Sequence, residues 1–378
     1  MFKIDLGKNS NVFLDNHYNR LVENSFTLGS QKIKNESSLK KRIDNRIQLL
    51  KSSLTSDPLC EKFFQDLKKD NYKWLKIIIQ GDPKQLSKVI ANVKTRISKG
   101  VYPNIEYMKK GDPDKKFGDH IRYVFNYDAF ITKPKISKSK VKAGIPYKYD
   151  AYKLAEAVNV NVCPYCNRGF TFTLTKGEER LVRPEFDHFF DKATYPYLAL
   201  SFYNLIPSCH ICNSGLKHDA AFTLGNNLHP YLEGLDDYLK FTVKLKDKKL
   251  LDGIRKKEIK DYISLFYGNL DGFSLDLIHR VGCERKNLRR ANQTHKVFKT
   301  IDLFEMHKDL IVEMLQSALI YNESLIQEYI INFEGKLFRN REDILRFLNR
   351  NYMKKEDLSK RPFSKINQDI AVEFGIPY

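Results

Sequence analysis

Four cysteines stand in two Cys-x-x-Cys pairs, Cys163/Cys166 and Cys209/Cys212, with 42 residues between the pairs. Each pair can direct two sulfurs at one ion from a tight turn, and four thiolates form the tetrahedral site that Zn²⁺ prefers. A thioredoxin-like redox motif or simple buried thiols would explain one pair. Two pairs in a chain that begins without an apolar leader favour structural zinc, which has no open coordination position and should do no chemistry itself.

Polar residues suited to phosphodiester hydrolysis lie between and just after these pairs. Asp187 and His188 are adjacent, Asn204 follows 16 residues after His188, and Asn213 comes directly after the last cysteine. A histidine with an ordinary pKa near 6.5 can take a proton from water, and carboxylate and amide oxygens suit a hard divalent cation. The alternatives are a buried histidine satisfied by a neighbouring carboxylate and, for Asn204, a residue that merely forms a turn.

The whole segment from Cys163 to Lys217, about 55 of the 378 residues, resembles an HNH (ββα-metal) nuclease in its zinc-braced form. The resemblance implies that His188 is the general base and that Asn204 orients the region around it. It also implies that Asp187 and Asn213 bind a catalytic Mg²⁺ or Mn²⁺, with His218 as a second choice for the Asn213 position. One such unit carries one active site, so a monomer should nick its substrate, and a double-strand break would need a homo-oligomer or sequential cuts.

A narrower resemblance extends over VNVCPYCNR, YNLIPSCHICNSGLK and the downstream HPYLEGLDDY. These segments are similar to the HNH subunits of Septu-type anti-phage defence systems, which implies a separate ATPase subunit as partner. The chain contains no GxxxxGK[ST] motif of its own, which agrees with that division. The rival interpretation is a zinc ribbon that binds nucleic acid or a protein partner and does not cut.

Charge is unevenly distributed along the chain. The formal net charge is +19, and residues 1–150 hold 31 basic against 16 acidic residues, whereas residues 151–230 hold seven of each. A basic excess fits a polyanionic partner such as nucleic acid. The resemblance makes DNA the expected substrate. Candidate phosphate contacts are Arg168, Lys217 and the lysine run of Lys133, Lys135, Lys138, Lys140 and Lys142. The alternatives are ordinary solvated surface and, for the run, a flexible linker.

The surrounding elements predict an α+β protein of three parts. Residues 1–150 form a basic helical region, 151–232 the HNH module, and 233–378 a mainly helical C-terminal region. Apolar residues at helical spacing predict a helix over 86–97, and alternation around a KGE turn predicts a hairpin within 169–182. A second hairpin is expected within 241–253, and long helices within 301–334. No segment has the length and apolarity of a membrane span, so we expect a cytoplasmic protein.

Overall fold

The computed structural model describes most of the chain, and it is a mixture of helices and small sheets. The described residues are 1–8, 10–23, 25–28, 31–34, 38–52, 56–104, 116–132, 149–177, 179–246, 270–321 and 323–376. Within these ranges every sheet is a two-stranded antiparallel pair: β1–β2, β3–β4, β5–β6 and β7–β8. An α+β class is therefore correct.

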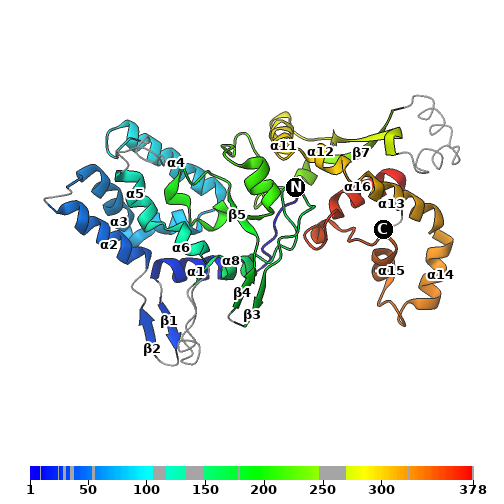
Figure 1. Cartoon of the computed structure of the whole chain (residues 1–378), viewed down its shortest axis with the longest axis horizontal. Helices are drawn as coiled ribbons and strands as arrows, with labels where there is room; N and C mark the ends of the chain where they lie inside the picture. The colour runs from blue at the N-terminus through cyan, green and yellow to red at the C-terminus, as the bar shows by residue number, and fades with distance from the viewer. Residues whose placement is uncertain are drawn as a thin grey trace.

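The N-terminal third is helical, as its periodicity predicts. Its elements are α1 (Ser10–Tyr18), β1 (Ser25–Leu28), β2 (Gln31–Lys34), α2 (Leu39–Lys51), α3 (Pro58–Gln80), α4 (Pro83–Ser98), α5 (Lys116–Val124), α6 (Tyr127–Ile131) and α8 (Ala151–Val158). Helix α4 shows the local cause: Asp82 caps its N-terminus in a reciprocal hydrogen-bond pair with Gln85, and Pro83 occupies the first turn. Helix α3 is broken between Lys69 and Tyr72, where the backbone leaves the helical region. These helices lie on the left in Figure 1.

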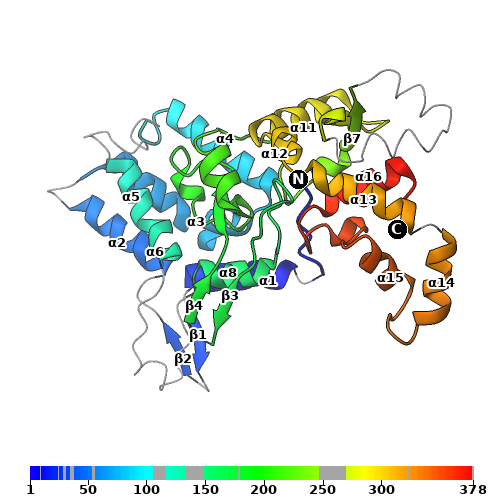
Figure 2. The same cartoon turned by 45° about the vertical axis from the view of Figure 1, so that its right-hand side comes forward.

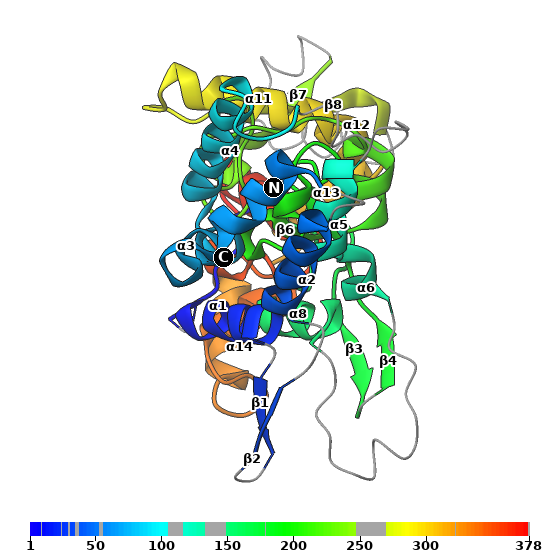
Figure 3. The same ribbon diagram turned by 90° about the vertical axis from the view of Figure 1, so that its left-hand side faces the viewer.

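The middle of the chain contains the two short sheets that follow α8. Strands β3 (Leu174–Lys176) and β4 (Glu179–Val182) form the hairpin predicted around the KGE turn. Strands β5 (Glu185–His188) and β6 (Leu205–Ser208) pair next, and a π-helix, η5 (Ile211–Lys217), follows β6. The hairpins β1–β2 and β3–β4 project from the same side of the molecule (Figure 3).

The C-terminal region begins with a strand pair and continues as helices. Its elements are β7 (Leu239–Leu245), β8 (Phe273–His279), α11 (Arg285–Val297), α12 (Thr300–Glu305), α13 (Lys308–Ile320), α14 (Glu323–Phe333), α15 (Arg341–Leu348) and α16 (Ser364–Phe374). Strand β7 pairs along its full length with β8, far downstream. The second half of the hairpin predicted within 241–253 lies outside the described residues. Local alternation predicts a strand but carries no information on its partner. Figure 2 shows β7 and α11 along one edge of this region, with α14 and α15 beyond them.

One large apolar core joins the N-terminal helices to the cysteine segment. Its members run from Met1 through the helices α2 to α8 and on to the buried cysteines, and it therefore crosses the expected boundary at residue 150. A second core lies between the β7–β8 pair and the helices α13 and α16, and a small third one lies between α14 and α15. None of the helices described is long and apolar enough to cross a bilayer.

His17 is a buried polar residue whose side chain lies among the residues of the large core. Its Nε2–H donates to the carbonyl of Leu200 at 2.8 Å, which leaves Nδ1 to accept from the Tyr149 hydroxyl at 2.9 Å. Burial lowers the pKa of His17 to about 4, because a charged imidazole cannot be solvated there.

We predict that the free energy of unfolding falls as the pH is lowered from 7 to 5. The unfolded histidine, with a pKa near 6.5, binds a proton in this window, whereas folded His17 does not, so His17 alone accounts for a loss of about 2 kcal/mol. Urea unfolding at both pH values measures it. His17→Gln should show a smaller difference between the two pH values than the unchanged protein, and an equal difference would contradict the assignment.

Candidate metal centre and hydrolytic site

The four cysteines predicted to bind zinc come together in one cluster. Their sulfur atoms all lie within 4.8 Å of one another, and Cys166 Sγ is 3.8 Å from Cys209 Sγ. Four sulfurs about 2.3 Å from a central ion stand roughly 3.8 Å apart at the corners of a tetrahedron. The cluster therefore fits a tetrahedral metal such as Zn²⁺.

The first cysteine turn is shaped to receive the second. Backbone N–H groups of Arg168 and Gly169 point at Cys166 Sγ from 3.4 and 3.5 Å. Hydrogen bonds, chiefly from the Cys163 thiol, hold the pKa of Cys166 well below its usual value, which favours the thiolate that a metal needs. A Cβ atom on Gly169 would lie only 2.7 Å from Cys209 Cβ, so only glycine permits this approach of the two turns.

Asn167, in the same turn, ties the metal cluster to the C-terminal region. It has a left-handed backbone, with φ of 53°, and its side chain is buried. Its Nδ2 donates to the carbonyl of Leu358 at 2.8 Å, and its Oδ1 accepts from the backbone N–H of Lys365 at 2.8 Å. Its own carbonyl accepts from the N–H of Phe363 at 2.6 Å. The cysteine turn and the start of α16 are thus fixed to each other by one residue.

Strand β5, strand β6 and helix η5 form a β–β–helix unit beside the cysteines. Glu185 pairs with Ser208, and His188 with Leu205, so β5 and β6 bring the first part of the segment against the second cysteine turn. Alternate residues of a strand share a face, so Glu185 and Asp187 point one way and His188 the other. Two residues of η5 about one turn apart, Asn213 and Lys217, lie against that first face.

His188 is a buried, neutral imidazole whose ring is held by one hydrogen bond. Its Nε2–H donates to the carbonyl of Ala199 at 3.0 Å, which fixes the tautomer and leaves the lone pair on Nδ1. Within the described part of the chain no hydrogen bond engages Nδ1. Burial, assisted by the positive charge of Lys192, lowers the pKa of His188 to about 3. The ring of Tyr127 stands edge-on to the imidazole, with centroids 4.5 Å apart.

Lys192 is a nearby residue that sequence reasoning missed. Its side chain is exposed, and its ammonium lies 4.4 Å from the centre of the Tyr127 ring, on whose edge His188 packs. A cation at this position can attract an anion toward His188. The only signal for it in the sequence is a spacing of four residues from His188.

Asp187 occupies a buried ion pair. Its Oδ1 accepts from Lys217 Nζ at 2.8 Å, and its Oδ2 accepts from the Tyr165 hydroxyl at 2.6 Å. Lys217 Nζ also donates to the carbonyl of His188 at 2.8 Å, and both charged side chains are nearly inaccessible to solvent. Lys217 is therefore not the phosphate contact expected from the sequence, because its charge is buried and already neutralised by Asp187.

Asn204 holds the loop that follows His188. Its Oδ1 accepts from the N–H of Phe190 at 2.7 Å, and its Nδ2 donates to the carbonyls of Phe190 and Leu198 at 3.0 and 3.1 Å. The side chain is fully buried, so these hydrogen bonds replace the ones that its polar atoms would otherwise make with water. The loop locked in this way includes Ala199, whose carbonyl orients His188 only five residues before Asn204.

Asn213 contacts Glu185 rather than Asp187. Glu185 Oε2 accepts from Asn213 Nδ2 and from Ser214 Oγ, both at 2.8 Å, and Oε1 lies 2.7 Å from His210 Nδ1. Partial burial would raise the pKa of Glu185, but the hydrogen bonds from these three residues lower it. A role for Glu185 is not predicted from the sequence. The available signal is its position two residues before Asp187, which places both side chains on the same face of the strand. The alternative ligand His218 lies at the end of η5 and pairs with Asp219.

The arrangement does not fit a divalent cation held jointly by Asp187 and Asn213. Both oxygens of Asp187 are engaged, and the ammonium of Lys217 takes the place beside the carboxylate where a cation would bind. The nearest acidic partner of Asn213 is Glu185, and its oxygens are also occupied. A hard metal would have to displace Lys217 from one carboxylate or His210 from the other.

The remaining expected phosphate contacts lie elsewhere. Arg168 directs Nη2 at His307 Nε2, 2.7 Å away, and borders a cavity in the C-terminal region. The lysine run of Lys133, Lys135, Lys138, Lys140 and Lys142 lies outside the described residues.

Comparison with known proteins found no matching family model, no matching curated protein and no matching solved structure.

Cys209→Ser should abolish stoichiometric zinc binding and lower the midpoint of thermal unfolding. A structural zinc site contributes on the order of 10–16 kcal/mol to folding, and one lost thiolate removes much of it. Metal analysis of the purified protein and thermal melting measure the two effects. Cys283→Ser, which removes a thiol that is not part of the cluster, is the control. Zinc content and melting equal to the control would show that the cluster is not a metal site.

Lys217→Met should destabilise the protein by about 3–5 kcal/mol, because it leaves the carboxylate of Asp187 buried without a counter-charge. The double variant Asp187→Asn/Lys217→Met should recover a large part of this loss, as measured by urea unfolding in a double-mutant cycle. Lys176→Met, on an exposed strand, controls for the substitution itself. If Lys217→Met is as stable as this control, the ion pair does not have the role given to it here.

Proposed function

We propose that this protein hydrolyses phosphodiester bonds of nucleic acid, as an HNH-type endonuclease with His188 as its general base. One observation carries the proposal. His188 is held neutral, with Nε2 committed to the Ala199 carbonyl and Nδ1 without a partner among the described residues. This histidine ends the first strand of a β–β–helix unit braced by four cysteines, which is the setting that the resemblance requires.

The chemistry follows from the chain's own groups. Nδ1 of His188 accepts a proton from the attacking water, and the Ala199 carbonyl keeps the ring oriented as the imidazolium forms. Burial opposes that charge, so protonation requires a negative group nearby, and the substrate phosphate supplies one. Lys192 attracts the phosphate to this side of β5, and Asn204 keeps the loop that carries Ala199 in place.

We propose that hydrolysis depends on a divalent metal ion, in addition to the residues already named. When bound, Mg²⁺ or Mn²⁺ would neutralise charge on the phosphate and on the leaving oxygen. Asp187 and Asn213 do not share a vacant position for it, so binding requires a rearrangement of Lys217 or of the Glu185 cluster. We also propose, from the resemblance alone, DNA as substrate, a role in anti-phage defence and a separate ATPase subunit as partner.

The buried ion pair favours a second candidate function. Lys217 neutralises the carboxylate that a nuclease would use for its metal. A zinc-braced module that binds nucleic acid or a protein partner without cutting would need no vacant carboxylate there. The two functions differ in whether His188 matters, since a binding module has no use for an oriented neutral base.

Nicking of supercoiled plasmid in the presence of Mg²⁺ or Mn²⁺ decides between them. We expect open-circular product, and a rate about 10²–10⁴-fold lower for His188→Ala, the range typical of a lost general base. His279→Ala, an exposed histidine on β8, is the matched control, and thermal melting verifies that both variants fold. Equal rates for His188→Ala and the control would exclude the mechanism.

The substrate and partner are tested in the same assay. If the pure protein, alone and with an ATPase encoded beside it, cuts neither DNA nor RNA, the nuclease function is wrong and the binding module stands.

A further inference from the structure

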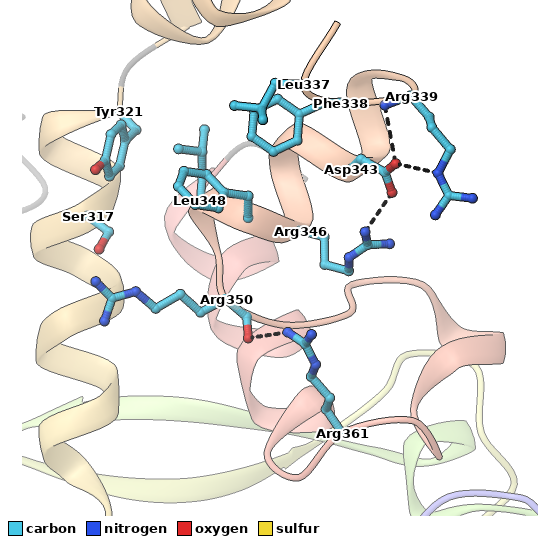
Figure 4. Close-up of a pocket in the computed structure, with 11 residues that line it drawn as sticks. Ser317, Tyr321, Leu337, Phe338, Arg339, Asp343, Arg346, Leu348, Arg350 and Arg361 are labelled. Carbon is cyan, nitrogen blue, oxygen red and sulfur yellow. Dashed lines mark hydrogen bonds and ion pairs between the residues drawn. The ribbon is translucent and has the colours of Figure 1, made fainter. Parts of the chain in front are cut away.

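Two adjoining cavities form one groove in the C-terminal region. The first has a volume of about 620 Å³ and the second about 530 Å³, and they share Ser317, Leu348, Arg350 and Arg361. Helix α13 forms one side, and α15 with the segment after it forms the other (Figure 4). The second cavity reaches Arg168 and Phe170, which follow the first cysteine turn. The groove thus runs from α15 to the residues that follow the first cysteine turn.

Positive charge dominates the groove. Its arginines are Arg168, Arg339, Arg346, Arg350 and Arg361, and its acidic residues are Asp343 and Glu313. Asp343 pairs with Arg339 and Arg346. Neither Arg350 nor Arg361 has an ion pair with a carboxylate among the described residues.

Both of these arginines line the two cavities where they meet. Arg361 Nη1 donates to the backbone carbonyl of Arg350 at 3.1 Å, and the Arg350 side chain extends toward α13 near Ser317 (Figure 4). Arg350 has a left-handed backbone, with φ of 54°, which is unusual for a residue other than glycine. Two neighbouring cations without a carboxylate partner are suited to successive phosphates, because guanidinium donates two parallel hydrogen bonds to such an oxyanion.

Exposed aromatic rings accompany the arginines. Phe347, in the first cavity, is 58% exposed and Phe170, in the second, is 62% exposed. Phe347 lies beside Phe338, with ring centroids 5.4 Å apart, and Phe170 lies beside Phe172 at 5.6 Å. A large ring left in water at the edge of a basic groove offers a flat surface on which a base can stack.

We propose that this groove binds single-stranded nucleic acid, with phosphates on Arg350 and Arg361 and bases on Phe347 and Phe170. Stacking on these rings requires unpaired bases, so a duplex is a poorer ligand. A mononucleotide would occupy only part of one cavity, whereas the continuous pair of cavities accommodates a strand of several nucleotides. The groove does not include His188, so this binding does not depend on the proposed hydrolysis.

Fluorescence anisotropy with labelled 12-nucleotide DNA and RNA strands, without added divalent ions, tests the proposal. Arg350→Ala/Arg361→Ala should bind about 10- to 100-fold more weakly than the unchanged protein. Its plot of log affinity against log salt should lose a slope of about 1.4, or about 0.7 for each lost phosphate contact. Lys84→Ala/Lys88→Ala, which removes the same charge from the exposed face of α4, should bind as the unchanged protein does.

Three outcomes would overturn the proposal. One is an affinity and salt slope of the folded arginine variant equal to those of the lysine variant. A second is a duplex of the same sequence that binds as tightly as the single strand. The third is that adenosine monophosphate binds in the groove and that single strands do not displace it.

A second variant tests the stacking step without changing charge. Phe347→Ala should weaken binding roughly 5- to 100-fold and leave the salt slope unchanged. Fluorescence of 2-aminopurine placed in the strand should be quenched by the unchanged protein and recover in Phe347→Ala. Equal quenching by both proteins would contradict the role of Phe347.

Discussion

The convergence of four sulfurs is the constraint on which the centre of this protein depends. Cys163 and Cys166 must meet Cys209 and Cys212 within 4.8 Å, and that closure fixes the two ends of the segment that contains β5 and β6. Closing a loop of this length costs chain entropy, and a bound metal offsets the cost. The position of strand β5 relative to η5 therefore depends on the clustering of the four cysteines. The positions of Asp187 and His188 depend on that clustering as well as on the contacts of their own side chains.

The ion pair of Asp187 and Lys217 illustrates how a buried charge orients an element. Removing two charges from water largely cancels their attraction, so such a pair adds little to stability relative to apolar residues. Its geometry is demanding, however, because Lys217 must reach both Asp187 and the carbonyl of His188. The pair thereby restrains the rotation of η5 about its axis. With η5 in this orientation, Asn213 faces Glu185.

The sequence predicts features that depend on local pattern and on spacing. The cysteine pairs, the β3–β4 hairpin and helix α4 all follow from neighbouring residues. Long-range partners do not. The pairing of β7 with β8, the contact of Asn213 with Glu185 and the burial of Lys217 depend on how separate elements meet. A lysine beside a cysteine turn looks the same in the sequence whether it faces solvent or a buried carboxylate.

Asn167 has a consequence for how far this chain can be divided. Because its side chain and carbonyl bind Leu358, Phe363 and Lys365, the first cysteine turn is completed by residues nearly 200 positions away. The apolar core likewise continues from the cysteines into the N-terminal helices. The segment that resembles a self-contained nuclease motif is therefore not a transplantable cassette. In another scaffold, the Asn167 turn would lose its hydrogen-bond partners and apolar side chains would be exposed to water. In this fold the motif and its surroundings form one architectural unit.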